Sequence, residues 1–142
     1  MIIYADTSFL VSLYITDQHS IVSRQQVLTA DGLWLTPLHR AEWAHAIAQH
    51  VFRGELSGSE AHEMHRQLHQ DESDGIWIAA SIPEEAFEAC ADLGRRYGPK
   101  LGVRTLDSLH VATALELKAK RFWTFDDRQR KLAKAAGLDS PG

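Results

Sequence analysis

Short, largely apolar runs alternate with longer amphipathic segments along this chain, and this alternation constrains its fold more than any other feature. A brief apolar run bounded by turn-forming residues is typical of a strand that is buried on both faces. We expect such strands at 1–5, 33–36, 76–80 and 122–125. Strands separated by helices favour a parallel sheet with helices on both sides, so the predicted fold class is α/β.

The intervening segments carry the residues expected at helix starts and ends. Pro37 lies where a first helical position should be, and its helix is expected to run to about Arg53. Gly98 and Pro99 are expected to break the helix that begins at Pro83. The expected helices are 8–15, 20–30, 37–53, one that begins at Ser57 or Ser59, 83–97, 105–120 and 127–136.

Length and composition indicate one ordinary globular domain. The chain has 142 residues, 44% of them hydrophobic and 24% charged, so a single domain over 1–142 is expected. Its one cysteine, Cys90, excludes an internal disulfide and a cysteine-rich zinc site. We find no signal peptide and no run of roughly 20 apolar residues, so the expected location is the cytoplasm.

Four acidic residues border the apolar segments: Asp6, Glu42, Asp107 and Asp126. Asp6 and Asp126 directly follow predicted strands, and Asp107 lies in the first turn of a predicted helix. In parallel α/β folds, sites form beyond the carboxyl ends of the strands. Carboxylates that meet there must be neutralised, and a hard divalent cation such as Mg²⁺ does this with oxygen ligands.

Each acid also has a purely structural explanation. Asp6 can cap the helix that follows it, and Asp126 begins a near match to a capping box over 126–129. Asp107 is favoured by the positive end of its helix dipole. Glu42 is harder to explain in this way, because it lies inside a helix and needs either a partner or a place at the helix edge.

The four acids together indicate phosphodiester hydrolysis by water. One Mg²⁺, or two held roughly 3.5–4 Å apart, would activate the water and stabilise the leaving oxygen. Ser8 and Thr124 lie beside acids and can orient a carboxylate or a water, or else serve as caps and strand-edge donors. His110, one turn after Asp107, either approaches the same pocket or is satisfied elsewhere.

The net charge of −4 argues against a general nucleic-acid coat protein but does not exclude a nuclease. Four basic residues lie close together in the sequence and are candidates for RNA binding; they are Arg95, Arg96, Lys100 and Arg104. The alternative is that they form a solvated helix end and loop.

The order and spacing of four motifs resemble those of PIN-domain proteins, and the chain length is similar to that of the VapC toxins of toxin–antitoxin pairs. The motifs are residues 6–10 (DTSFL), Glu42, residues 105–112 (TLDSLHVA) and residues 124–126 (TFD). The resemblance covers nearly the whole chain. It implies a PIN-like three-layer α/β/α fold around a short parallel sheet of four or five strands. The segment 137–142 has no apolar run, so the fifth strand is expected to be minimal.

The resemblance also implies a function: an endoribonuclease that depends on Mg²⁺ or Mn²⁺ and cuts structured RNA such as tRNA or rRNA. It implies a homodimer that is inhibited by a cognate VapB-type antitoxin, whose C-terminal segment enters the active-site groove. The family's metal-binding acids correspond to the four acids named above. Its supporting hydroxyls correspond to Ser8 and Thr124, and Asp127 is a candidate to share the role of Asp126.

Two other functions fit parts of the sequence. The first is a PIN-fold module that binds RNA or protein without catalysis, which the retention of all four acids disfavours. The second is a receiver-type domain that is phosphorylated on an aspartate. A receiver needs an acid directly after its central strand, but no acid follows the run 76–80 until Glu84.

Overall fold

A four-stranded parallel sheet forms the centre of the computed structural model, which describes residues 2–141. The strands are β1 (Ile2–Ala5), β2 (Gly32–Leu35), β3 (Trp77–Ala79) and β4 (Phe122–Trp123), in the spatial order β3-β2-β1-β4. β1 therefore lies between β2 and β4, with Ile3 opposite Leu33 and Ala5 opposite Trp123. The predicted strands and the parallel α/β sheet are confirmed.

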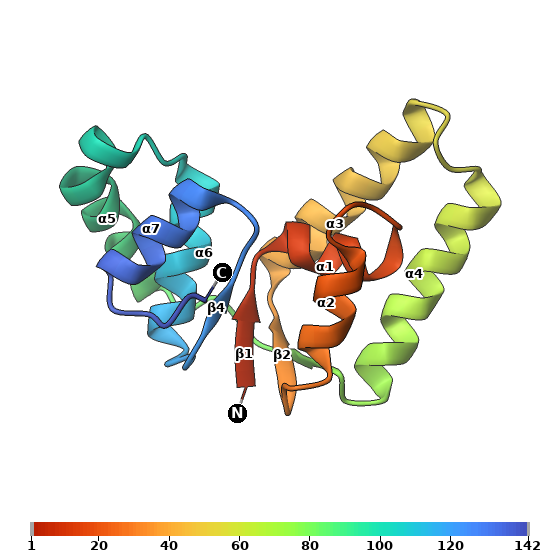
Figure 1. The fold of residues 1–142 in the computed structure, drawn as a ribbon, viewed down its shortest axis with the longest axis horizontal. Coiled ribbons are helices and arrows are strands. Elements are labelled where there is room, and N and C mark those ends of the chain that lie inside the picture. The colour runs from red at the N-terminus through yellow and green to blue at the C-terminus, as the bar shows by residue number, and fades with distance from the viewer. Residues whose placement is uncertain (1, 142) are drawn as a thin grey trace.

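Seven helices in the described part of the chain cover the sheet on its two sides. Figure 1 shows α5, α6 and α7 on one side and α1 to α4 on the other, with α3 and α4 forming a long hairpin that extends past the sheet. The predicted three-layer α/β/α architecture is thus confirmed. The helix bounds are α1 Thr7–Tyr14, α2 Ser20–Val27, α3 Pro37–Phe52, α4 Gly58–Ser73, α5 Glu85–Leu101, α6 Thr105–Glu116 and α7 Asp127–Ala135.

The sheet separates two hydrophobic cores. Successive strand residues point to opposite faces, so β1 contributes Ile3 and Ala5 to the core under α1, α3 and α4. It contributes Tyr4 to the second core, which lies under α5, α6 and α7. Burial on both faces explains why β1 is apolar up to Ala5. Asp6 is then the first residue beyond the end of the strand.

Most helix starts follow the residues that predicted them, but some helix ends do not: α2 ends at Val27 and α6 at Glu116, before the expected positions 30 and 120. Thr36 caps α3 just before Pro37, and Ser57 caps α4. The predicted break at Gly98 and Pro99 is wrong, because α5 continues to Leu101 and ends at Gly102 in the left-handed conformation. Packing explains the continuation: Leu101 is partly buried against the second core, which outweighs the backbone hydrogen bond that Pro99 cannot make.

The end of the chain adds almost nothing to the sheet, as its composition predicts. A single isolated parallel bridge joins Arg121 to Asp139 beside β4. The hydroxyl of Ser140 donates to the carbonyl of Phe122 at 2.7 Å and secures this segment. None of the helices in residues 2–141 combines the length and the apolarity that a bilayer-crossing segment needs.

Candidate active site at the carboxyl ends of the strands

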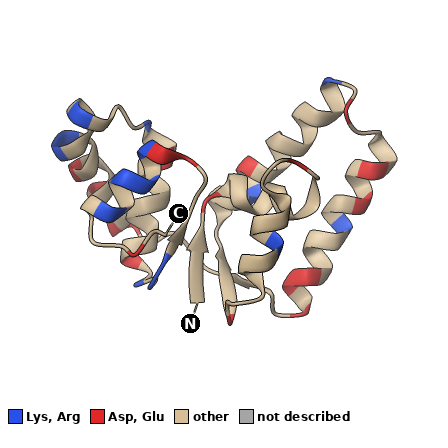
Figure 2. Cartoon of the chain, in the orientation of Figure 1, with Lys and Arg blue, Asp and Glu red and all other residues tan. Residues whose placement is uncertain are grey.

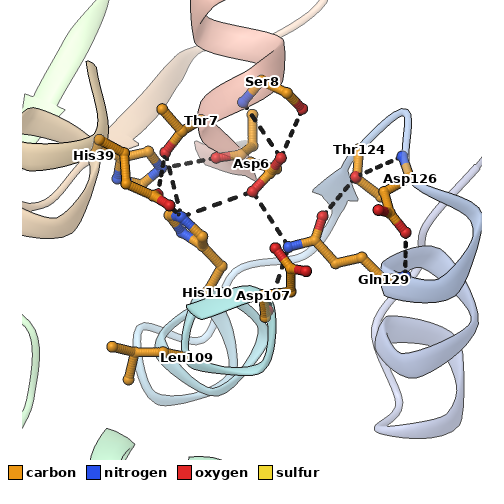
Figure 3. A network of polar contacts seen from close by, with 12 residues as sticks. Asp6, Thr7, Ser8, His39, Asp107, Leu109, His110, Thr124, Asp126 and Gln129 are labelled. Carbon is orange, nitrogen blue, oxygen red and sulfur yellow. Dashed lines mark hydrogen bonds and ion pairs between the residues drawn. The ribbon is translucent and has the colours of Figure 1, made fainter. Parts of the chain in front are cut away.

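Three of the four predicted acids come together where β1 and β4 end. Asp6 directly follows β1, Asp126 lies between β4 and α7, and Asp107 is in the first turn of α6. The pairing of β1 with β4 brings the first two segments side by side, and Figure 3 shows all three acids around one network of polar contacts. A cleft of about 430 Å³ opens beside them and is lined by 102–104, Asp107 and 126–128.

The carboxylate of Asp6 is held at both oxygens. Its Oδ2 accepts hydrogen bonds from the Ser8 hydroxyl at 2.6 Å and the Ser8 backbone N–H at 3.3 Å. Its Oδ1 accepts from Gln129 Nε2 at 3.2 Å and lies 3.7 Å from His110 Nε2. Burial raises the pKa of Asp6, but His110 and the hydrogen bonds from Ser8 and Gln129 outweigh it and hold the pKa below its usual value.

Gln129 connects the three acidic segments, a role that was not predicted from the sequence. Its Nε2 donates to Asp6 and also, at 3.3 Å, to the backbone carbonyl of Asp107. Its own backbone N–H donates to Asp126 Oδ1 at 2.9 Å. The near match to a capping box over 126–129 is half realised: Asp126 caps α7, but the Gln129 side chain turns toward Asp6.

The two hydroxyls singled out in the sequence both contact this network. Ser8 supports Asp6 directly, as described above. Thr124 Oγ1 donates to Gln129 Oε1 at 2.6 Å and accepts from the Asp126 backbone N–H at 3.0 Å. Both hydroxyls therefore orient groups that border the cleft, although Thr124 acts on Asp6 only through Gln129.

Asp107 carries the least compensated charge in the cluster. Burial raises the pKa of its carboxyl, and the neighbouring carboxylates of Asp6 and Asp126 raise it further. Arg104 opposes this rise, but its Nε lies 3.8 Å from Asp107 Oδ2 and its side chain is 87% exposed, so the pair is loose. A cation bound beside Asp107 would therefore relieve this repulsion between carboxylates.

Glu42 belongs to an adjoining cluster with Thr7 and His110. Its Oε1 accepts from the Thr7 hydroxyl at 2.7 Å and lies 2.5 Å from His110 Nε2. Burial raises the pKa of Glu42, but the contacts with His110 and Thr7 outweigh it, and the pKa lies below its usual value. The helical position of Glu42 is thus explained by partners on α1 and α6, and His110 links it to Asp6.

His110 and His39 are both buried and fully engaged. The hydroxyl of Tyr4 lies 2.6 Å from His110 Nδ1. His39 Nε2 lies 2.8 Å from the Ala5 carbonyl, and His39 Nδ1 accepts from the Thr36 backbone N–H at 3.0 Å. Burial lowers the pKa of His39 to about 3, so this imidazole is neutral and donates to Ala5, the residue that precedes Asp6.

Asp127 lines the same cleft as Asp126 but makes different contacts. Its side chain is 83% exposed and pairs with Arg130 Nη1 at 2.6 Å, whereas Asp126 accepts the capping bond of α7. Among the basic candidates, Arg104 lines the cleft, and Arg96 lies 3.4 Å from Asp92 on the surface of α5. Arg128, which sequence analysis did not single out, lines the cleft as well.

Basic residues gather on the half of the molecule that carries the cleft. Residues 95–134 contain eleven of the fifteen lysines and arginines but only four acids. In Figure 2 the ribbon is coloured for basic residues on α7 and at the end of α5, and for acidic residues along α4 on the opposite side. The net charge of −4 therefore conceals a strong asymmetry.

The donor set fits a hard divalent cation, because it consists of carboxylate oxygens that repel one another. Residues 2–141 contain no three His, Cys, Asp or Glu side chains already grouped tightly enough to hold a metal ion. Mg²⁺ needs fewer, since it keeps several waters and commonly binds through one or two carboxylates. Asp107 and Asp126 line the cleft together with Asp127, and Asp6 is joined to them through the side chain of Gln129.

The fold and the acidic cleft define an α/β protein whose carboxylates lie at the carboxyl ends of the neighbouring strands β1 and β4. A model of the PIN domain matches residues 3–135. The chain therefore belongs to the PIN domain family, which confirms the resemblance seen in its motifs. No curated protein matches the chain.

Solved structures with the same fold match nearly the whole chain. VapBC2 from Rickettsia felis, bound to a promoter DNA fragment, has a TM-score of 0.69 at 12% identity and covers 99% of this chain and 98% of its own. FitAcB from Neisseria gonorrhoeae has a TM-score of 0.69 at 19% identity, with 100% and 97% covered. VapC20 from Mycobacterium tuberculosis, a toxin that cleaves the sarcin–ricin loop, has a TM-score of 0.68 at 13% identity, with 97% and 96% covered.

Proposed function

We propose that this protein is a VapC-type endoribonuclease toxin that depends on Mg²⁺, with Mn²⁺ able to replace it, and hydrolyses phosphodiester bonds of structured RNA such as tRNA or rRNA. One observation carries the proposal: carboxylates from three separate segments meet at or beside the cleft, and burial together with their mutual repulsion raises the pKa of Asp107. Carboxylates that repel one another destabilise the folded protein until a cation binds between them. Perturbed pKa values of this kind are typical of functional sites.

Asp6, Asp107 and Asp126 are the residues that would hold the cation, and Glu42 would complete the acidic set from its place beside His110. When bound, the cation neutralises the phosphate and activates the attacking water. The protein's own side chains hold the carboxylates in place. Ser8 and Gln129 keep Asp6 ionised and fixed in orientation, and Thr7 and His110 do the same for Glu42.

The charge asymmetry supports RNA as the substrate. Arg104 and Arg128 line the cleft itself, and Arg95, Arg96 and Lys100 on α5 add positive charge to the same half of the molecule. Phosphate contacts of this sort position a nucleic acid without reading its sequence. A polyanion would therefore be drawn to the half of the molecule that carries the acids, and the cation would offset their repulsion.

Regulation by an antitoxin rests on the likeness to VapBC2 and FitAcB, which match this chain over nearly its full length. On that basis we propose a cognate VapB-type antitoxin as its partner. A homodimeric state and a place in the cytoplasm are further parts of the proposal and rest on the resemblance of its motifs to those of VapC toxins. The likeness to VapC20 supports structured RNA as the target class.

The test is a cleavage assay on total tRNA and rRNA with Mg²⁺, with Mn²⁺ and with EDTA. We expect cleavage with either metal, none with EDTA, and a loss on the order of 100-fold or more in Asp6→Asn. The matched control is Asp74→Asn, because Asp74 ends α4 on the acidic side of the molecule and bonds only to Gln70 among side chains. Metal-independent cleavage, or full activity in Asp6→Asn, would refute the proposal.

The alternative is a PIN-fold module that binds RNA or protein without cutting. It predicts that RNA binds at the basic half but stays intact at every metal concentration. Gel shifts run alongside the cleavage assay separate the two functions, because the alternative gives a shift without products.

A further inference from the structure

Gln129 is buried, with 1% of its surface exposed, and every polar atom of its side chain is engaged. The Thr124 hydroxyl donates to Oε1. Nε2 has two hydrogens, and its two neighbours are the Asp6 carboxylate and the Asp107 carbonyl, which only accept. This environment fixes the orientation of the amide, since the reverse orientation would place its oxygen against two other acceptors.

The two bonds of the amide join parts of the chain that are otherwise far apart in sequence. Asp6 directly follows β1 and Asp107 lies in the first turn of α6, while Gln129 itself is on α7. A single side chain thus sets the spacing between the segments that carry the acids of the cleft. The backbone N–H of the same residue holds Asp126, the third acid.

A neutral amide has a particular advantage in this position. Lysine or arginine would also donate to Asp6, but a full positive charge there would repel a divalent cation and compete with it for the carboxylate. Gln129 supplies the donors without that charge. It occupies Asp6 Oδ1 from the α7 side and, together with Ser8 on Oδ2, stops the carboxylate from rotating.

We propose that Gln129 is a positioning residue, which presents Asp6 and Asp107 in the arrangement that binds the divalent cation. The inference rests on the proposed function, because it concerns how the same site is prepared. Groups that orient metal ligands from outside the coordination sphere typically contribute 10–100-fold in affinity or activity, so we expect about 10-fold or more weaker binding without the amide.

The experiment measures Mn²⁺ binding to the metal-free protein by electron paramagnetic resonance, with no RNA present. Gln129→Met keeps the length of the side chain and removes both donors. The matched control is Gln67→Met, since Gln67 is also a partly buried amide that donates to an aspartate, Asp71, but on α4 away from the cleft. We expect the Mn²⁺ dissociation constant to rise about 10-fold or more in Gln129→Met and to change less than about two-fold in Gln67→Met.

Thermal unfolding of each variant separates positioning from simple stability. A residue with only a structural role would lower the unfolding temperature and leave the Mn²⁺ affinity of the folded protein unchanged, which would overturn the inference. Gln129→Asn provides a second variant if Gln129→Met does not fold; its shorter amide cannot span both acceptors, so it must also weaken Mn²⁺ binding. Wild-type protein that binds no Mn²⁺ would refute the proposed function and this inference with it, whereas normal binding in both Gln129 variants would refute this inference alone.

Discussion

The Nε2 atom of His110 lies 2.5 Å from Oε1 of Glu42, and the His110 side chain is completely buried. Tyr4 contacts the other ring nitrogen, so the imidazole connects a carboxylate of the cleft region with the second hydrophobic core. This contact makes the acidic site part of the fold's own polar framework. A substitution at this contact should therefore change the stability of the whole fold.

Removing this imidazole should destabilise the protein strongly. His110→Leu removes the buried partner of the Tyr4 hydroxyl and one of the two partners of the half-buried Glu42 carboxylate, and leaving such groups unsatisfied costs about 1–3 kcal/mol each. Urea denaturation measures the loss directly. The control, His62→Leu, changes an exposed histidine of α4 and should stay within about 0.5 kcal/mol; equal losses in the two variants would contradict the framework described here.

Neutralising Asp107 should stabilise the metal-free protein. Its pKa is raised in the folded state, so folding favours the protonated form, and stability falls as pH rises from the unfolded to the folded pKa. Asp107→Asn removes the charge that causes this loss. At neutral pH in EDTA we expect a Tm increase of roughly 2–4 °C, equivalent to about 1 kcal/mol in a chain of this size.

The gain in Asp107→Asn should shrink as the pH is lowered, because the wild-type carboxyl is then protonated as well. Melting curves collected across the acid range check this sign. If the variant is less stable than wild type at neutral pH, the charge of Asp107 is already compensated within the fold. That result would contradict a role for Asp107 as a cation ligand.

Thr124 should matter for stability through its two hydrogen bonds. Thr124→Val leaves Gln129 Oε1 without its donor and the Asp126 N–H without its acceptor, and unsatisfied buried groups of this kind cost about 1–3 kcal/mol each. Chemical denaturation of Thr124→Val measures the cost, with Thr29→Val as a control whose hydroxyl bonds only at the exposed end of α2. A loss no larger than that of the control would show that water replaces both contacts.

RNA binding should lose salt dependence when the cleft arginines are removed. Each phosphate contact contributes a slope of about 0.7–0.9 in log affinity against log salt concentration. The double variant Arg104→Ala and Arg128→Ala should therefore lower the magnitude of the slope by the contribution of up to about two phosphate contacts. Filter binding in EDTA measures it, and the pair Arg53→Ala and Arg66→Ala, on the α3–α4 hairpin, should leave the slope unchanged.

The sequence predicts the strands and three of the clustered acids well, because both depend on local patterns. An apolar run that ends in Asp6 or Asp126 identifies a buried strand and the edge where it stops. The helix break at Pro99 fails as a prediction because a distant contact, the burial of Leu101 against the second core, outweighs the local preference.

Gln129 could not be predicted for the same physical reason. Its partner Asp6 lies 123 residues away, and only the pairing of β1 with β4 brings them together. The sole local signal was the spacing from Asp126, which describes the cap of α7 and says nothing of the side chain's direction. His110 is an intermediate case: its helical spacing from Asp107 indicated the right neighbourhood, but its partners Tyr4 and Glu42 lie on other elements.

The central claim is that Asp6, Asp107 and Asp126 share one divalent cation in the cleft. Crystals of the protein soaked in Mn²⁺, with diffraction data collected near the manganese absorption edge, test this directly. We predict an anomalous difference peak between these carboxylates that disappears in Asp107→Asn crystals treated in the same way. A cleft without a peak at saturating Mn²⁺, or a peak held by other residues, would contradict the account.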